Sequence, residues 1–317
     1  MTMFKLIFCS FVSVMTLFTF LENVWSESGP VKCVKDSLGE TVCVRRPQPR
    51  VVSLAPSLTE LVFALKAGSR LVGRTTKCNI PEAAKKVTDV GAYTTPDFER
   101  VMAVRPDLVL APRIGIRPEF IERLKSLKIP VYIDDSSNIE EIEQLVNNVG
   151  KLVGTENEAD RIVNDIKIRR NKITKLMSGH EKPTVLFVIG IRPLVVAGGK
   201  SFLGALVREA GGSNIAEFTA VEYPKFSIEE VLRRDPYVIF MLNKECQGQG
   251  CINQWTDYGY LKAIKNNRVY VLDADLISRP GSRTIEALER LATFLHPDVF
   301  GGAKNSSPLT SSSTNVH

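Results

Sequence analysis

The side chains most able to do chemistry are few in this chain and stand far apart. The three histidines are His180, His296 and His317. None lies at ligand spacing from another, so a zinc site is not expected. The GGK stretch at 198–200 lacks the spacing of a phosphate-binding loop, and no G-x-S-x-G sequence occurs. Asp134 and Asp135 could form a carboxylate pair, but adjacent residues in or beside a strand point in opposite directions. We therefore expect a protein that is not an enzyme and that needs no cofactor or metal.

The six cysteines fit an exported protein better than a catalytic one. Cys33 and Cys43 flank VKDSLGETV, whose turn residues between short β-type runs predict a hairpin with bridgeable ends. Cys246 and Cys251 flank a second short loop, QGQG. In an oxidising compartment each pair favours a disulfide over two free thiols. Cys78 is left over, and its simplest role is that of a small, partly buried apolar residue.

The two ends of the chain are unlike its middle. Residues 1–26 have the features of a cleaved signal peptide: a lysine near the start, an apolar run over 6–21, and small residues before position 27. The alternative is a membrane anchor, but the run is shorter than the roughly 20 apolar residues of a spanning helix. Residues 301–317 are rich in Ser, Thr and Asn, so we expect a disordered tail.

The net charge of +6 is modest for a chain of 317 residues. Pairs of basic residues are scattered without interleaved aromatic residues. A nucleic-acid-binding protein would carry a concentrated basic stripe, so we expect no nucleic-acid partner.

Strand-like and helix-like stretches alternate twice along the chain. The pattern predicts two Rossmann-like α/β lobes with parallel sheets, at 50–138 and 179–300, after a β-hairpin extension at 27–49. In the first lobe, Ser57 is expected to cap a helix that follows the strand RVVSLA.

Between the lobes, residues 139–178 predict a helical bridge. Thr155 and Glu158 form an apparent capping box, which starts a helix running to about Met177. Its apolar face would comprise Ile162, Val163, Ile166, Ile173 and Leu176. Some 22 residues of helix span about 33 Å, the size of a lobe. A single stiff helix between the lobes would allow a ligand cleft between them to close only a little.

One phrase occurs in both predicted lobes. DFERVMAVRPD at 97–107 returns as SIEEVLRRDPY at 227–237. Asp97 and Ser227 are expected helix caps, with Glu230 completing a capping box with Ser227. A proline ends each helix before an apolar strand.

Glu99 and Glu229 occupy the same position in the two copies of this phrase. A carboxylate in the first helical turn gains about 0.3–1 kcal/mol from the helix dipole, which by itself could account for both glutamates. That explanation does not account for their equivalent places in two similar lobes. We therefore consider a second role, in contacting a partner.

Most of the sequence resembles a known family. From Arg50 to Pro297 it is similar to the substrate-binding proteins of ABC importers, of the helical-backbone type that serves cobalamin, siderophores and haem. The resemblance rests on RVVSLAPSLTEL, LVGRTTKCNIP, VGAYTTPDFERVMAVRPDLVLA, LVREAGGSNI and VLDADLISRPGSR. It is strongest toward the cobalamin-binding members. It implies that Glu99 and Glu229 dock into arginine pockets on the two subunits of a permease dimer, which carries its own ATPase subunits.

The resemblance also implies a set of ligand-binding residues. They are Lys77, Cys78, Tyr93, Arg113, Tyr223, Asp275 and Arg279. The two tyrosines match aromatic positions that hold the corrin ring, and aromatic faces suit a broad, flat macrocycle. Lys77 and Arg113 depart from the cobalamin pattern, so a siderophore remains an alternative ligand.

Taken together, the sequence predicts a monomeric periplasmic binding protein, exported with a cleaved signal peptide, whose transported ligand is a cobalt corrinoid. A ferric siderophore and haem are the alternatives, and Cys78 with a tyrosine could ligate haem iron. An exported enzyme and a scaffold for a metal cluster are more remote alternatives.

Overall fold

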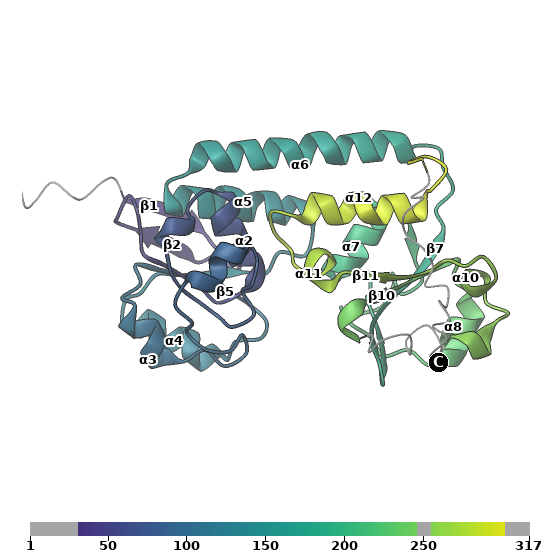
Figure 1. Cartoon of the computed structure of the whole chain (residues 1–317), viewed down its shortest axis with the longest axis horizontal. Coiled ribbons are helices and arrows are strands. Elements are labelled where there is room, and N and C mark those ends of the chain that lie inside the picture. The colour runs from purple at the N-terminus through teal and green to yellow at the C-terminus, as the bar shows by residue number, and fades with distance from the viewer. Residues whose placement is uncertain (1–30, 246–254, 302–317) are drawn as a thin grey trace, which may run out of the picture. The chain divides into compact units, whose positions relative to one another are not determined.

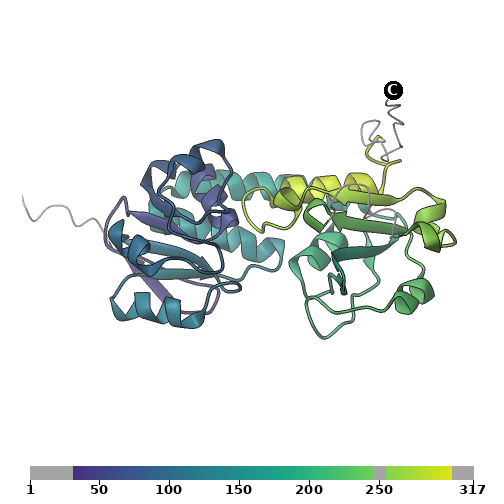
Figure 2. The ribbon, with the colours of Figure 1, turned by 60° about the horizontal axis from the view of Figure 1, so that its bottom comes forward.

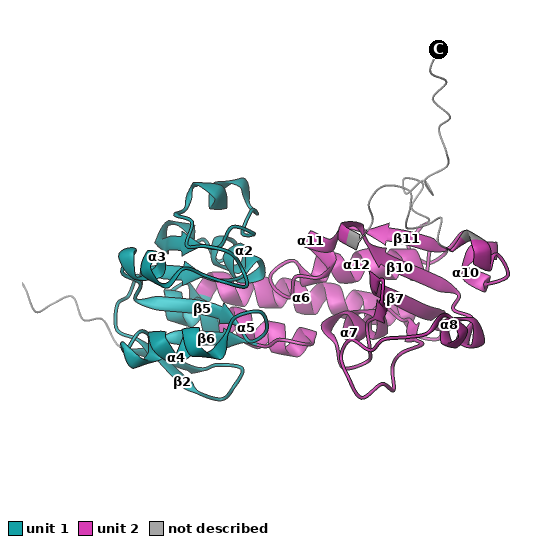
Figure 3. Ribbon diagram, turned by 90° about the horizontal axis from the view of Figure 1, so that it is seen from below, with its two compact units in different colours: residues 1–134, 148–156 teal, residues 135–147, 157–317 magenta. Residues whose placement is uncertain are grey.

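The computed structural model describes residues 31–245 and 255–301, which form two compact units. Unit 1 comprises residues 31–134 and 148–156, and unit 2 comprises residues 135–147, 157–245 and 255–301 (Figure 3). Within the described ranges, none of the helices combines the length and the apolar character that crossing a membrane requires.

Unit 1 is built on a four-stranded parallel sheet in the order β4-β3-β5-β6. Its strands are β3 (Val51–Ser53), β4 (Leu71–Arg74), β5 (Leu108–Pro112) and β6 (Val131–Asp134). Its short helices are α2 (Pro56–Ala64), η1 (Gly68–Arg70), η2 (Glu82–Lys86), α3 (Phe98–Ala103) and α4 (Pro118–Ser126). Strands β3, β5 and β6 are buried and largely apolar, as expected for a parallel sheet covered on both faces, whereas edge strand β4 alternates buried and half-buried residues.

A disulfide-linked hairpin at the start of unit 1 packs beside the four-stranded sheet of that unit. Strands β1 (Lys32–Lys35) and β2 (Thr41–Val44) pair antiparallel, and Cys33 lies opposite Cys43 in a disulfide, which confirms that prediction. Val34, Val42 and Val44 are buried. The turn reaches edge strand β6, where the amide of Ser37 donates to the carbonyl of Ile133 at 3.0 Å. The amide group of Asn148 donates to the carbonyl of Lys35 at 3.0 Å and to the hydroxyl of Tyr132 at 3.2 Å, so α5 (Ile139–Val153) also holds the hairpin.

Unit 2 contains a sheet in the order β11-β10-β7-β8, with β9 pairing beside β7. Its strands are β7 (Thr184–Ile191), β8 (Leu194–Val196), β9 (Ser213–Asn214), β10 (Val238–Leu242) and β11 (Val269–Leu272). All pairings are parallel except that of β8 with β7. Its shorter helices are α7 (Phe202–Glu209), α8 (Ile228–Arg234), η3 (Asn243–Glu245), η4 (Thr256–Tyr258), α10 (Lys262–Lys265), α11 (Ala274–Ile277) and α12 (Thr284–Leu295).

The long helix α6 (Glu156–Met177) has the 22 residues that the sequence predicts. Within unit 2 it lies alongside α12 (Figures 1 and 2), where the guanidinium of Arg169 donates to both carboxylate oxygens of Glu289 at 2.9 and 2.5 Å. Arg170 makes the same two-point contact with Glu209 of α7, at 2.9 and 2.7 Å. Paired guanidinium–carboxylate contacts fix orientation as well as distance, so α6 is held rigidly on this unit.

Three local expectations are wrong. The N-cap position of helix α2 is Ala55, which makes no side-chain capping bond, and Ser57 lies inside the helix, because Pro56 at the first helical position already has the φ angle that a helix needs. Thr155 does not cap α6: its hydroxyl is buried, with no hydrogen-bond partner among the described residues. Leu176, predicted to lie on the buried face of α6, is 37% exposed, whereas Val163 and Ile166 on that face are buried.

Candidate ligand-binding site

In unit 1, the predicted ligand residues gather in the loops that follow the carboxyl ends of the parallel strands, here called the carboxyl edge. Lys77 and Cys78 follow β4, and Arg113 follows β5. The amide of Arg113 donates to the carbonyl of Asp134 at 2.8 Å, which joins the ends of β5 and β6. Open α/β sheets bind their ligands at this edge, beside the point where the strand order reverses. The strand order reverses between β3 and β5.

Tyr93 is held in place at this edge by two loops. Its hydroxyl donates to the carbonyl of Ile114 at 3.1 Å, and its ring lies over Gly115. Gly115 has φ +101°, and a Cβ there would come within 2.8 Å of the ring, so only glycine fits. The amide of Thr76 donates to the carbonyl of Gly91 at 3.0 Å and ties the Tyr93 loop to the loop after β4. Burial, and then the negative charge of Asp134, raise the pKa of Tyr93.

The other three predicted residues of unit 1 differ in exposure. Lys77 and Arg113 are exposed, whereas Cys78 is fully buried. The thiol of Cys78 lies 3.2 Å from the hydroxyl of Thr75, inside the loop. The lysine and arginine side chains are therefore exposed, whereas the thiol is covered.

In unit 2, Tyr223 stands on a loop that the main chain anchors closely. The amide of Gly198 donates to the carbonyl of Glu222 at 2.7 Å, and that of Val196 donates to the carbonyl of Pro224 at 3.0 Å. A Cβ on Gly198 would lie 2.6 Å from the carbonyl oxygen of Val221, so the loop approaches a position that only glycine can occupy. Partial burial, and then the carboxylate of Glu222, raise the pKa of Tyr223.

This loop, residues 217–223, displays three apolar side chains. Phe218 is 97% exposed, Val221 57% and Tyr223 43%. An ordered loop that presents a group of apolar side chains to solvent is typical of a contact surface. Of these three side chains, only Tyr223 was predicted from the sequence. The apolar letters at 218 and 221, in a stretch with no strand or helix pattern, were the signal for the other two.

The remaining predicted ligand residues of unit 2 lie at the carboxyl edge of its sheet. Asp275 lies on α11, just after β11, and one of its carboxylate oxygens accepts from Arg279 at 2.7 Å. The same oxygen pairs with Lys244, which follows β10. Sequence analysis brought Asp275 and Arg279 together but missed Lys244, which stands 31 residues from Asp275 in the chain.

The repeated phrase forms α3 and α8, with the predicted caps. The carboxylate of Asp97 accepts from the amide of Arg100 at 3.0 Å, and the hydroxyl of Ser227 accepts from the amide of Glu230 at 3.3 Å. The capping box is only half formed, because the carboxylate of Glu230 pairs with Arg233 and Arg234. The residue before each proline has a positive φ, +48° at Arg105 and +42° at Asp235.

Glu99 and Glu229 are both exposed in the first turn of their helices. Glu99 has an exposed partner, Arg123, at 3.5 Å. The backbone amide of Glu229 itself and the hydroxyl of Ser227 hold the pKa of the Glu229 carboxyl below its usual value. Each unit thus presents an accessible carboxylate at an equivalent position, charged at neutral pH in the case of Glu229.

Two predictions remain, one on the second cysteine pair and one on metal binding. The proposed Cys246–Cys251 bridge lies outside the described residues. Within residues 31–245 and 255–301, no three His, Cys, Asp or Glu side chains come together as a group that could hold a metal ion.

Known proteins resemble this chain over most of its length. A vitamin B12-binding protein of Vibrio parahaemolyticus is 28% identical over 242 residues, covering 76% of this chain and 87% of the relative. The crystal structure of the periplasmic vitamin B12 binding protein BtuF of Vibrio cholerae has a TM-score of 0.71 and 25% identity, covering 79% of this chain and 98% of that one. A periplasmic heme binding protein from Pseudomonas aeruginosa has a TM-score of 0.70 and 26% identity, covering 78% of this chain and 93% of that one.

The sequence profile described as periplasmic binding protein matches residues 51–276. This match and the named relatives confirm the predicted α/β fold and the predicted family. Members and relatives are binding proteins rather than enzymes, as the sequence analysis expected. The chain belongs to the periplasmic binding protein family, whose members bind a small molecule and deliver it to an ABC permease.

Proposed function

We propose that this protein captures a corrinoid outside the cytoplasm, after export with a cleaved signal peptide, and delivers it to an ABC permease. The observation that carries the proposal is the similarity to vitamin B12-binding proteins over nearly their whole length. In support, each unit has a tyrosine at a position that suits a macrocycle, Tyr93 and Tyr223.

The two tyrosines would bind through their rings. The hydroxyl of Tyr93 is already engaged with a backbone carbonyl, so the ring presents its face and edge to a ligand while the phenol holds its orientation. Such a side chain is rigid before binding, and little conformational entropy is lost when a ligand packs against it. Tyr223 stands with Phe218 and Val221 on an anchored loop and would contribute a second apolar surface.

Haem is the second candidate, because a heme binding protein is among the similar structures. The chain offers tyrosine, an established haem-iron ligand, whereas the Cys78 thiol is covered in the structure. A ferric siderophore is the third candidate, for which the exposed cations Lys77 and Arg113 would supply charge.

Visible spectroscopy and calorimetry test the proposal directly. Residues 27–317 are purified and titrated with cyanocobalamin, haemin and a ferric siderophore in turn. We expect saturable, one-to-one binding of the corrinoid and weaker or no binding of the other two. Saturable binding of haemin or the siderophore alone would replace the corrinoid by that ligand, and binding of none would refute the proposal.

Substitution of both tyrosines tests where the ligand binds. The Tyr93→Ala/Tyr223→Ala variant should lose about 2–4 kcal/mol of binding free energy, as for buried aromatic anchors. Tyr260→Ala is the matched control: this tyrosine is 55% exposed and precedes α10, which packs near the start of β10, at the opposite edge of the sheet. Unchanged affinity of the double variant would remove both tyrosines from the site.

A further inference from the structure

The loops after two neighbouring parallel strands of unit 2 are joined by side chains. Asn243 follows β10, and its side-chain oxygen accepts from the amide of Ala274, which follows β11, at 3.0 Å. The next residue on each side, Lys244 and Asp275, form an ion pair. The pair therefore lies at the carboxyl edge of the β10–β11 strand pair, where open α/β sheets bind ligands.

A single oxygen of Asp275 is shared by two cations. Arg279 reaches it at 2.7 Å from one helical turn further along, and the side chain of Arg279 is only 10% exposed. Lys244 reaches the same oxygen from the other loop, with its side chain 59% exposed. Asp273 lies two residues before Asp275, and one of its carboxylate oxygens accepts a hydrogen bond from the backbone amide of Asp275 at 2.9 Å.

The two cations are not equivalent. The nearly buried arginine already compensates the carboxylate of Asp275. The exposed lysine is a second cation on a carboxylate that has its partner, and an exposed pair of this kind contributes little. Its ammonium group, on a flexible stem, can thus exchange Asp275 for another anion without leaving a buried charge unpaired.

We propose that Lys244 is a ligand-selecting residue, which binds an anionic substituent, a carboxylate or a phosphate, on the ligand of this protein. The inference rests on the proposed function and specifies the class of ligand: a macrocycle or chelate with a negatively charged side group. Asp275 and Arg279 position the lysine in the ligand-free protein. Asn243 joins the loop after β10 to the start of α11 after β11.

Paired ligands that differ in the anionic group test the proposal. Cyanocobalamin carries a phosphodiester and dicyanocobinamide lacks it; haemin carries two carboxylates and its dimethyl ester carries none. Calorimetry compares wild type, Lys244→Gln and Lys244→Arg, with Lys262→Gln as the control. Lys262 is also exposed and paired with an aspartate, Asp235, at 3.2 Å, but it lies near the start of β10.

We expect Lys244→Gln to weaken binding of the anionic member of a pair by about three- to tenfold and to leave the uncharged member unchanged. Lys244→Arg should retain most of the affinity, and Lys262→Gln should match wild type. Equal affinities of Lys244→Gln and wild type for the anionic ligand, or equal losses for both members of a pair, would overturn the inference and leave the proposed function standing. Wild-type protein that binds neither corrinoids nor haem would overturn both.

Discussion

The disulfide of the hairpin gives a stability prediction that can be worked from the structure. Cys33 and Cys43 are directly opposite in the β1–β2 pair and close a loop of ten residues in sequence separation. The double variant Cys33→Ser/Cys43→Ser leaves in place the contacts of the hairpin with the rest of unit 1, among them the ion pair of Lys32 with Glu156 at 2.5 Å. The main effect of the change is therefore on the unfolded chain, which gains freedom.

The size of this effect follows from the loop length. The chain-entropy model gives about 2.7 kcal/mol at 25 °C for a closed loop of ten residues. We expect the variant to lose about 2–3 kcal/mol of unfolding free energy. The buried Val34, Val42 and Val44 should keep the hairpin docked in the native state, so ligand affinity should remain that of wild type.

Urea denaturation measures the loss with two probes. Far-UV circular dichroism follows the whole chain, and tryptophan fluorescence follows unit 2, because Trp255 is buried there and Trp25 falls within the expected signal peptide. Leu38→Ser, at the half-exposed turn of the same hairpin, is the control and should change the free energy by less than about 0.5 kcal/mol. A loss below about 1 kcal/mol in the cysteine variant would refute the reasoning that the cross-link stabilises unit 1.

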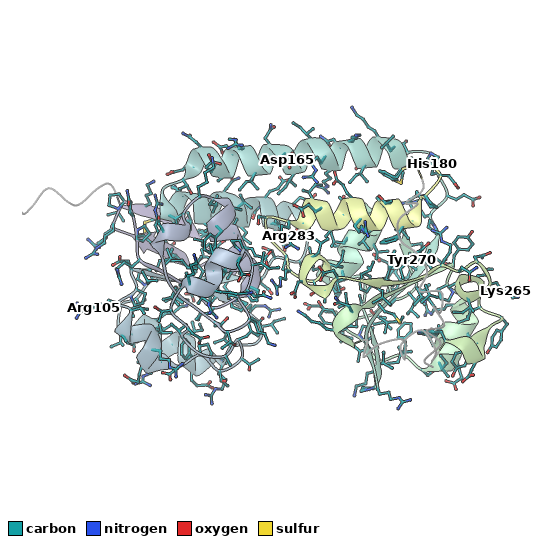
Figure 4. The ribbon with its side chains drawn as sticks, viewed as in Figure 1. Arg105, Asp165, His180, Lys265, Tyr270 and Arg283 are labelled. Carbon is teal, nitrogen blue, oxygen red and sulfur yellow. A yellow bond between two sulfur atoms is a disulfide. The ribbon has the colours of Figure 1, made fainter. Side chains whose placement is uncertain are left out.

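Three further predictions concern other parts of the chain. The double variant Glu99→Ala/Glu229→Ala should fold and bind ligand nearly as wild type does, because both side chains are exposed. In reconstituted vesicles it should abolish or sharply weaken ligand uptake and stimulation of the transporter ATPase. Normal transport would show that the glutamates act only as helix-start residues. Burial chiefly lowers the pKa of His296, against its contact with the Gly211 carbonyl. The stabilisation from neutral His296 should therefore be complete above about pH 6.5 and decrease as the pH falls below that value. His296→Gln should flatten this slope, whereas a slope unchanged from wild type would exclude the histidine as its source. The exposed His180, beyond the C-terminal end of α6 (Figure 4), has its ring centroid 6.4 Å from that of His296 and its charge adds to the lowering of the His296 pKa, so His180→Gln should reduce the slope without removing it. Thiol titration of denatured, unreduced protein that lacks residues 1–26 should find one free sulfhydryl, that of Cys78, and finding three would show that Cys246 and Cys251 are not bridged.

The sequence predicted well those features that depend on local patterns. The alternation of buried apolar runs with amphipathic stretches gave the parallel strands, and the spacing of apolar residues gave α6 its length. The hairpin and its disulfide followed from turn residues between two cysteines. The expectation for Thr155 failed because a side chain of the right type at a helix start can be buried by its neighbours instead of capping, which no local pattern reveals.

The candidate site was less accessible to sequence analysis because its members meet only through the fold. Cys78 and Lys77 are neighbours in the chain, yet one is buried and the other exposed. Lys244 was missed because it joins Asp275 across two strand ends rather than along a helix. The contact of Tyr93 with the Ile114 carbonyl likewise joins two loops that are 21 residues apart. Residue type indicates what a side chain can bind, whereas the backbone decides which side chains meet.

The loop at 217–223 has a consequence for how ligand preference could change in evolution. Its base is constrained, because Gly198 and Gly199 leave no room for a side chain against the loop backbone. Its middle is less constrained, because the side chains of Phe218 and Val221 are 97% and 57% exposed. Substitutions there would alter the shape and polarity offered to a ligand with small effects on stability, as for surface positions in general. Exposed side chains of this loop could therefore change in evolution while Gly198 and Gly199 beneath it stay fixed.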